Sequence, residues 1–374
     1  MNLKIGIVGL PNAGKSTLFN ALLKKQVAEA ANYPFTTIEP NIGVVPVPDG
    51  RLIKLAEITK DEEKMDKFPP LVPATVQFVD IAGLVKGASE GEGLGNKFLS
   101  HIREVDLVVN VIRYFDDPSV VHVAGDVDPE RDRGIIETEL MLADLQTLSK
   151  QQEPFGFTQG KPMGKSTKED FEKWELVVKL KAGLDSGKPA REVLSDPDDQ
   201  ILIGDLHLLS MKPVLYVGNV SEGQMTNPTN LTNPTNEWFN GKNVIMISAK
   251  VEAELASLSI EEQKAYLKEL GLEASGLDRL IAKAYEMLGL ISFLTCGVIE
   301  ARAWTIARGM KAPQAAGVIH TDFEKKFIKA DVVTFSDFVT LNGWKSARES
   351  GKVRSEGKEY VMQDGDVVEF KIGS

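Results

Sequence analysis

The sequence contains a single cysteine, Cys296, so neither a disulfide framework nor a cluster of thiolate metal ligands is expected. No apolar run approaches the length of a membrane span. The pattern of an export signal is also missing, because Met1 leads almost directly into an apolar run that is typical of a buried strand. We therefore expect a cytoplasmic protein without a membrane partner, in which Cys296 is a small buried apolar residue.

The sequence has fewer basic than acidic residues, because 43 Lys and Arg and 54 Asp and Glu give a net charge of −11. This balance argues against indiscriminate electrostatic binding to nucleic acid, and we expect no DNA partner. The deficit is uneven, because residues 287–374 contain 12 Lys and Arg against 11 Asp and Glu. This nearly neutral C-terminal quarter predicts a domain boundary near residue 287 and is compatible with a separate partner.

The sequence is rich in alternating strand and helix patterns. At 374 residues it is long enough for two or three domains. Near-continuous apolar, β-branched runs predict strands of a parallel sheet that is buried on both faces, at residues 3–8, 74–79, 106–112, 213–217 and 243–247. Helical patterns lie between or after them, at residues 15–23, 94–103 and 276–288. The alternation predicts a doubly wound α/β fold whose ligands bind at the C-terminal ends of the strands.

Two parts of the chain depart from this alternation. Helical patterns at residues 133–149 and 169–184 flank a segment rich in Gly, Pro, Lys and Ser at residues 154–166. They predict an inserted antiparallel helical arm with a loose tip, and one crossover helix followed by a disordered loop is the alternative. From Leu290 onward, short apolar runs and tight turns such as Asp364-Gly365 predict a small α+β domain.

A phosphate-binding loop is predicted at residues 9–17, which read Gly-Leu-Pro-Asn-Ala-Gly-Lys-Ser-Thr. The match to Gly-x4-Gly-Lys-Ser follows a buried strand directly and opens a helix, which is the setting that the motif requires. Its glycines let main-chain N–H groups turn towards phosphate oxygens, and the helix N-terminus adds a positive dipole end. Lys15 would reach the β- and γ-phosphates, and Ser16 would bind Mg²⁺. The chain is therefore expected to be a P-loop nucleotide hydrolase.

A second phosphate motif, Asp80-Ile-Ala-Gly83, stands at the end of a predicted strand. Asp80 would hold Mg²⁺ through water, and Gly83 would free its N–H for the γ-phosphate. Upstream, the polar and proline-flanked residues 32–40 include a threonine that could complete the Mg²⁺ shell only while the γ-phosphate is present. Thr37 is favoured over Thr36 for this role. Together these segments predict a nucleotide-dependent switch.

The phosphate motifs belong to a set of longer segments, at residues 9–17, 33–41, 80–96, 302–305 and 312–324. These segments resemble the Obg-like ATPases, the YchF subfamily of the Obg GTPases, over nearly the whole chain and least in the inserted arm. The resemblance implies a Ras-like P-loop domain with a helical coiled-coil insertion, followed by a C-terminal TGS domain of β-grasp fold. The expected limits are 1–287 for the first domain, 116–210 for the insertion and 288–374 for the TGS domain.

The resemblance also implies residues for the hydrolysis step. Leu84 stands where Ras-type GTPases carry a water-orienting glutamine, and a leucine can neither donate to water nor accept from it. A histidine is proposed to place the water in relatives, and the matching residue is His122, with a structural histidine as the alternative. Asn12 matches an asparagine that binds K⁺ in related GTPases, where a cation offsets transition-state charge. Thr36 replaces a cysteine of some relatives, which puts redox control through that position in doubt.

Base choice is indicated by Asn219-Val220-Ser221-Glu222, which follows a predicted strand. GTPases read guanine here with Asn-Lys-x-Asp, whose Asp accepts from the ring N1–H and the exocyclic amine. Residues 219–222 contain no Lys and have Glu in place of the Asp. Adenine lacks the N1–H donor, so a carboxylate that reads guanine is less useful, and ATP is favoured over GTP. Ser248 and Ala249 are expected beneath the base. The predicted nucleotide-binding residues are Asn12, Ala13, Gly14, Lys15, Ser16, Thr17, Asn219, Val220, Glu222, Ser248 and Ala249.

We expect a slow ATPase that uses Mg²⁺, accepts GTP less well, and acts as a ribosome-associated switch in translation or stress response. The resemblance implies contact with rRNA and ribosomal proteins through the helical arm and the TGS domain. Four lysines of the C-terminal domain either meet rRNA phosphates or form a solvated face: Lys311, Lys325, Lys326 and Lys329. The alternatives are an Obg-type GTPase of ribosome assembly and a non-enzymatic scaffold that nucleotide only stabilises.

Overall fold

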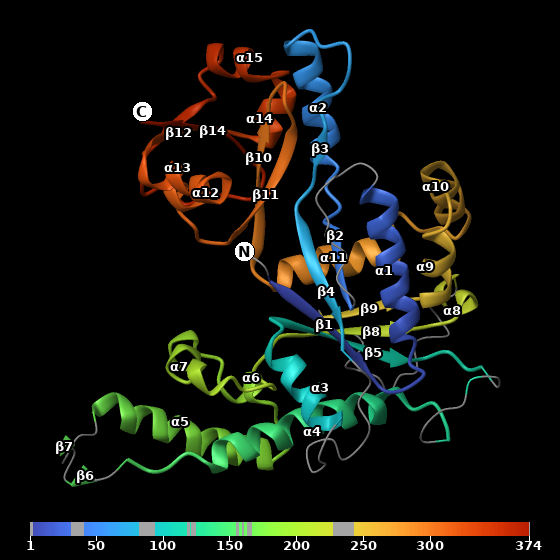
Figure 1. The fold of residues 1–374 in the computed structure, drawn as a ribbon, viewed down its shortest axis with the longest axis vertical. Helices are drawn as coiled ribbons and strands as arrows, with labels where there is room; N and C mark the ends of the chain where they lie inside the picture. The colour runs from blue at the N-terminus through green and yellow to red at the C-terminus, as the bar shows by residue number, and fades with distance from the viewer. Residues whose placement is uncertain are drawn as a thin grey trace.

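The computed structural model describes residues 3–30, 41–81, 94–117, 120, 125–154, 157–158, 161–162, 167–226 and 243–373. Within these residues no helix is both long enough and apolar enough to cross a membrane. The described residues form a six-stranded sheet with helices on both faces, a helical arm, and a second six-stranded sheet with its own helices (Figure 1). This arrangement confirms the predicted α/β domain with an inserted helical arm and a C-terminal α+β domain.

The N-terminal sheet has the strand order β2-β4-β1-β5-β8-β9. All neighbours are parallel except β2 and β4, and each of the five predicted strands is present. The C-terminal ends of the parallel strands, which carry Gly9, Asp80 and Asn219, therefore lie at one edge of the sheet. The strands are β1 (Lys4–Gly9), β2 (Ile42–Pro46), β4 (Thr75–Asp80), β5 (Leu107–Arg113), β8 (Val214–Asn219) and β9 (Val244–Ile247).

Strand β5 shows that both faces of this sheet are covered, because every one of its residues is buried. Leu107, Val109 and Val111 face the apolar core beneath α1 and α11, whereas Val108 faces a second core beneath α3. Alternating side chains of one strand thus enter two cores, which explains its continuous apolar sequence. The helices of this part are α1 (Lys15–Ala30), α3 (Leu94–Arg103), α8 (Glu222–Thr226), α9 (Ala249–Leu255), α10 (Ile260–Glu269) and α11 (Gly276–Met287).

The described residues between β5 and β8 form the predicted antiparallel arm (Figure 1). Asp128 caps the first long helix, and Thr167 and Asp170 form a capping box at the start of the second. Apolar side chains such as Leu148 and Leu180 pack between the two helices, so the alternative of a single crossover helix does not hold. The elements are α4 (Pro129–Ser149), β6 (Phe157–Thr158), β7 (Lys161–Pro162), α5 (Lys168–Asp185), α6 (Ala190–Val193), α7 (Pro197–Leu202) and the 3-10 helix η1 (Gly204–Leu206).

Polar contacts fix the root of the arm to the sheet. Asp144 on α4 is buried and accepts from the N–H (2.8 Å) and the hydroxyl (2.6 Å) of Ser210, just before β8. Arg191 of α6 donates to Glu137 on α4 (2.7 Å), and the same carboxylate accepts from the hydroxyl of Tyr216 in β8. Hydrogen bonds to charged groups are stronger than neutral ones, so the root of the arm is held firmly beside β8.

The C-terminal residues form a mixed sheet with the strand order β13-β12-β14-β10-β11-β3. β10 and β11 form an antiparallel hairpin, and β14 runs parallel to β10 and antiparallel to β12. This arrangement confirms the α+β prediction. The elements are β10 (Leu290–Cys296), β11 (Ala301–Ala307), α12 (Ala312–Ile319), α13 (Thr321–Lys325), β12 (Phe327–Thr334), α14 (Phe335–Thr340), α15 (Trp344–Glu349), β13 (Arg354–Glu356) and β14 (Asp366–Ile372).

The connection between β2 and β4 packs against this C-terminal sheet. Its helix α2 (Arg51–Glu62) buries Leu52 and Leu55 in an apolar core that also contains residues of both sheets. Its strand β3 (Leu71–Val72) pairs in parallel with β11 and becomes an edge of the C-terminal sheet. The domain limits 1–287, 116–210 and 288–374 stay a prediction. In the structure, α2 and β3 belong to the N-terminal part of the sequence but pack with the C-terminal domain, and β3 joins its sheet.

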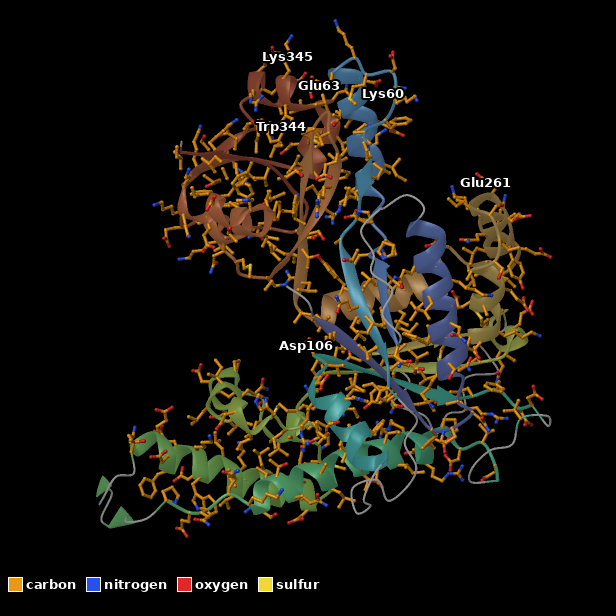
Figure 2. The ribbon with its side chains drawn as sticks, in the orientation of Figure 1. Lys60, Glu63, Asp106, Glu261, Trp344 and Lys345 are labelled. Carbon is orange, nitrogen blue, oxygen red and sulfur yellow. The ribbon has the colours of Figure 1, made fainter. Side chains whose placement is uncertain are left out.

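Polar contacts at both ends of α2 fix this connection to the C-terminal sheet and its helices. At one end Arg51 donates to Asp364 (2.8 Å). At the other end Glu62 accepts from the N–H groups of Trp344 (3.1 Å) and Lys345 (2.7 Å). Figure 2 shows Trp344 and Lys345 near the end of α2 that carries Lys60. Glu62 therefore satisfies N–H groups at the start of α15 that have no partner within that helix.

Gly343 permits this approach, since its φ is +115° and a Cβ there would lie 2.4 Å from the Glu62 carboxylate. We expect Gly343→Ala to lower the free energy of unfolding by about 1–3 kcal/mol, because alanine is strained at this φ and displaces Glu62. Urea denaturation measures the change. The matched control is Gly357→Ala, whose added methyl would meet nothing within 4 Å. Equal unfolding midpoints for the two variants would contradict the prediction.

Candidate nucleotide-binding site

The phosphate-binding loop lies between β1 and α1, as the motif predicts. Gly9 ends β1 with φ +152°, Asn12 has φ +63°, and Gly14 precedes α1 with φ +99°. A Cβ at Gly9 would lie 2.4 Å from the carbonyl oxygen of Val111, and one at Gly14 would lie 2.1 Å from Nδ2 of Asn219. Both positions therefore require glycine. The first turn of α1 contains no acidic residue, so its N–H groups and dipole suit an anion.

The side-chain amide of Asn219 joins this loop to the neighbouring strand ends. Its Nδ2 donates to the carbonyl of Ala13 (2.9 Å), and its Oδ1 accepts from the N–H of Ala249 (2.9 Å). Asn219 is buried at the end of β8, and Ala249 begins α9 directly after β9. One amide thus brings together the segments predicted to bind phosphate and base. A direct contact of Asn219 with nucleotide stays a prediction.

Lys15 and Asp80 place opposite charges at the phosphate end of the sheet. Lys15 is 8% exposed, and its Nζ donates to the carbonyl of Leu10 (2.8 Å). Burial lowers the pKa of Lys15, and the charge of Asp80 opposes that shift. Burial likewise raises the pKa of Asp80, and the charge of Lys15 opposes it. Each group is therefore desolvated beside an opposite charge, as expected where a phosphate and its metal ion are bound.

The oxygen groups predicted to hold Mg²⁺ are of the kind that this ion prefers. Ser16 lies exposed in the first turn of α1, and Asp80 offers a carboxylate whose pKa is raised by burial. A cation beside Asp80 would offset that desolvation, so the two residues fit the ion. Among the described residues no group of three or more His, Cys, Asp or Glu side chains could hold a metal ion. The other predicted metal and catalytic residues lie outside the described residues: Thr37, Gly83 and His122.

The residues predicted around the base also lie at this edge. Val220 is buried, and its N–H donates to the carbonyl of Ile247 at the end of β9 (2.9 Å). Ser248 is buried and caps α9, because its hydroxyl accepts from the N–H of Val251 (3.5 Å). Glu222 differs, since it begins α8 and is exposed. Val220 and Ser248 are therefore buried residues that fix the main chain of this region, whereas Glu222 presents its carboxylate to solvent.

Gln224 belongs to this region although the sequence prediction did not include it. Its Oε1 accepts from the N–H (2.8 Å) and the hydroxyl (3.0 Å) of Ser221. Its Nε2 donates to the carbonyl of Tyr114, directly after β5 (3.3 Å). The Ser-x-x-Gln spacing of a capping box was visible in the sequence, but the contact with Tyr114 was not.

Arg113 was also missed, although a cation at the end of an apolar strand is a signal in itself. Its side chain is buried and donates to the carbonyls of Phe115 (3.1 Å), Asp117 (3.2 Å) and Val120 (2.9 Å). Its guanidinium also lies over the ring of Phe115, 4.5 Å from the ring centroid. Arg113 therefore orders the start of the segment that leads to His122.

Comparisons with known proteins agree with this geometry. A family model described as a 50S ribosome-binding GTPase matches residues 4–153, and a YchF GTPase C-terminal model, described as a protein of unknown function, matches residues 290–373. The Bacillus subtilis protein named "Ribosome-binding ATPase YchF" is 49% identical, with 100% of each chain covered. The chain belongs to the YchF family. The same-named protein of Escherichia coli O157:H7 is 46% identical, with 99% of each chain covered.

A solved YchF structure shows the same fold. The Schizosaccharomyces pombe YchF GTPase superimposes with a TM-score of 0.85 at 40% identity, and the match covers 99% of this chain and 98% of that chain. The two family models leave residues 154–289 between them, which include the second long helix of the arm and the base region. The YchF relatives and the solved structure span those residues, so the family likeness extends to the whole chain.

The pairing of charges in this YchF site can be tested by titration. We expect Asp80→Asn to lower the pKa of Lys15 further, because the charge of Asp80 is what raises it against the effect of burial. Carbon-13 NMR of the Lys15 side chain, followed against pH without nucleotide, measures the shift. The control is Glu57→Gln, a charge change on α2 that should leave Lys15 unchanged. A Lys15 titration that Asp80→Asn does not move would contradict the pairing.

Proposed function

We propose that this chain binds and hydrolyses ATP with Mg²⁺, accepts GTP less well, and acts as a cytoplasmic, ribosome-associated switch in translation or stress response. The observation that carries the proposal is the strand–loop–helix unit of β1, the phosphate-binding motif and α1, in which Lys15 is buried and the opposite charge of Asp80 acts on it. A buried cation and a carboxylate at this edge suit a nucleoside triphosphate and its metal ion. The names of the bacterial relatives support both ATP hydrolysis and ribosome binding.

The phosphate end of the proposed site uses the loop and the first turn of α1. Lys15 contacts the β- and γ-phosphates, and N–H groups of the loop surround their oxygens. Mg²⁺, when bound, neutralises charge on the phosphate oxygens. The residues proposed to hold it are Ser16, Thr37 and Asp80. The other nucleotide contacts proposed here are Asn12, Ala13, Gly14, Thr17 and the N–H of Gly83.

Water activation is proposed to depend on His122, because Leu84 offers no polar group where related GTPases use glutamine. A neutral imidazole can accept a proton from water near neutral pH. The hydrogen bonds of buried Arg113 to the carbonyls of Phe115, Asp117 and Val120 support this role, since they hold main chain shortly before His122. We also propose K⁺ beside Asn12, which is exposed and has a left-handed backbone conformation.

The preference for ATP rests on the Asn219–Glu222 segment. A carboxylate that reads guanine gains selectivity when it is buried, because an unpaired buried acceptor is costly. Glu222 is exposed, so leaving it unpaired costs little and guanine gains little advantage. Ser248 and Ala249, together with Val220, complete the proposed base site. An Obg-type GTPase is the second candidate, because one family model and the fission-yeast structure carry GTPase in their descriptions.

The arm and the C-terminal domain, which we assign as a TGS domain, are the proposed docking surfaces for rRNA and ribosomal proteins. Two of the candidate lysines have ion-pair partners within the chain: Lys311 lies beside Glu359 (2.5 Å) and Lys329 beside Asp331 (3.1 Å). Lys325 and Lys326 are exposed on and just after α13. This pair is therefore the better candidate for a phosphate contact.

Hydrolysis provides the first test of the proposal. Lys15→Ala should lower the rate of phosphate release from ATP at least about a hundredfold, because it removes the ammonium group proposed to contact the β- and γ-phosphates. The control is Lys24→Ala on the same helix, whose ammonium group contacts Ser257 at the surface and should be dispensable. Release of inorganic phosphate under saturating Mg²⁺ measures the rate for each variant.

A binding competition with labelled ATP, read together with the phosphate-release rates, separates the competing functions. Unlabelled ATP should displace labelled ATP at lower concentration than GTP does. Displacement by GTP at the lower concentration would favour the Obg-type GTPase. Equal phosphate release by the Lys15→Ala and Lys24→Ala variants would favour the scaffold, in which nucleotide only stabilises the fold.

A further inference from the structure

The side chain of Gln224 links the turn after β8 to the end of β5 by hydrogen bonds. Gln224 accepts from the N–H (2.8 Å) and hydroxyl (3.0 Å) of Ser221 and donates to the carbonyl of Tyr114 (3.3 Å). The carbonyl of Asn219 closes the connection, because it accepts from the N–H groups of Tyr114 (2.8 Å) and Phe115 (3.2 Å). We call this closed set of hydrogen bonds the base clasp.

Further hydrogen bonds join Asn219 and Val220 to the end of β9, to the start of α9 and to the phosphate-binding loop. The N–H of Val220 donates to the carbonyl of Ile247 (2.9 Å). The amide of Asn219 is bonded to Ala13 and Ala249 (2.9 Å each). A site that is ordered before its ligand arrives loses less conformational freedom on binding, and therefore binds more tightly. Within the base clasp, one side chain, that of Gln224, makes the bonds to Ser221 and to the carbonyl of Tyr114.

Helix capping explains only part of the role of Gln224. Ser221 and Gln224 have capping-box spacing, and capping accounts for the bonds between them. It does not account for the bond to Tyr114, which ties α8 to a different strand. Helix α8 has five residues and is too short to be stable alone, so its position depends on what it is bonded to.

We propose that Gln224 is a positioning residue for the nucleotide base, which holds residues 219–222 in their binding geometry through Ser221 and Tyr114. This inference rests on the proposed ATP site and adds to it a residue outside the predicted motifs. The role requires an amide, because one end of the side chain accepts and the other donates. A carboxylate would place an acceptor against the carbonyl of Tyr114, and an apolar side chain would make neither bond.

The test compares a ligand that has a base with one that has none. Isothermal titration calorimetry with Mg²⁺ should show ADP binding about fivefold to tenfold more weakly to Gln224→Ala than to the unmodified chain. Gln224→Met, which keeps the length of the side chain without its polar atoms, should lose as much. Inorganic tripolyphosphate should bind all of them equally. The control is Gln263→Ala, since Gln263 donates to Leu258 (3.1 Å) and should leave both ligands unaffected.

ADP affinity within twofold of the unmodified chain for both Gln224 variants would overturn the proposal. Parallel loss of ADP and tripolyphosphate would overturn it too, because it would show collapse of the whole site. Failure of the ATP site itself has a different signature: the unmodified chain would bind neither ligand, or Lys15→Ala would bind both unchanged. A selective loss of ADP in the two Gln224 variants supports the positioning role.

Discussion

The amide of Asn219 is the contact on which the rest of the proposed site depends. It bonds the phosphate-binding loop at Ala13 and the start of α9 at Ala249, which lie far apart in the sequence. Its approach is possible only because Gly14 has no side chain, since a Cβ there would lie 2.1 Å from Nδ2. The contact therefore needs both glycine at position 14 and asparagine at position 219. Because Lys15 follows Gly14 directly, the same contact helps to fix the main chain that carries the Lys15 side chain.

The structure also joins this site to the candidate docking surfaces. β4 ends on Asp80, and the connection that precedes it contributes α2 and β3 to the C-terminal domain. β8 ends on Asn219, and Tyr216 within it bonds to the root of the arm through Glu137. Each candidate docking surface is thus attached to a strand that carries a residue of the proposed site.

The sequence was sufficient for the elements that follow local rules. The phosphate motif, the buried strands and the two long helices each carry their own pattern, and all were predicted. Neither helix α2 nor its packing against the C-terminal sheet was predicted, and a helical pattern does not by itself say which distant surface covers the helix. Arg113 and the contact of Gln224 with Tyr114 were missed for a related reason: the partners are main-chain carbonyls, which carry no side-chain signature. A sequence motif identifies the chemistry of a site, whereas the main-chain contacts that hold its residues in place are seen only in the folded structure.

Nucleotide control of ribosome binding is the central claim, and sedimentation tests it most directly. The full chain would be spun with ribosomes in the presence of ATP, ADP or a non-hydrolysable ATP analogue with Mg²⁺, and the bound fraction measured. We predict that the analogue and ADP give clearly different bound fractions, because in the proposed switch the γ-phosphate completes the Mg²⁺ site only in the triphosphate state. Equal binding in all three nucleotide states would contradict the claim.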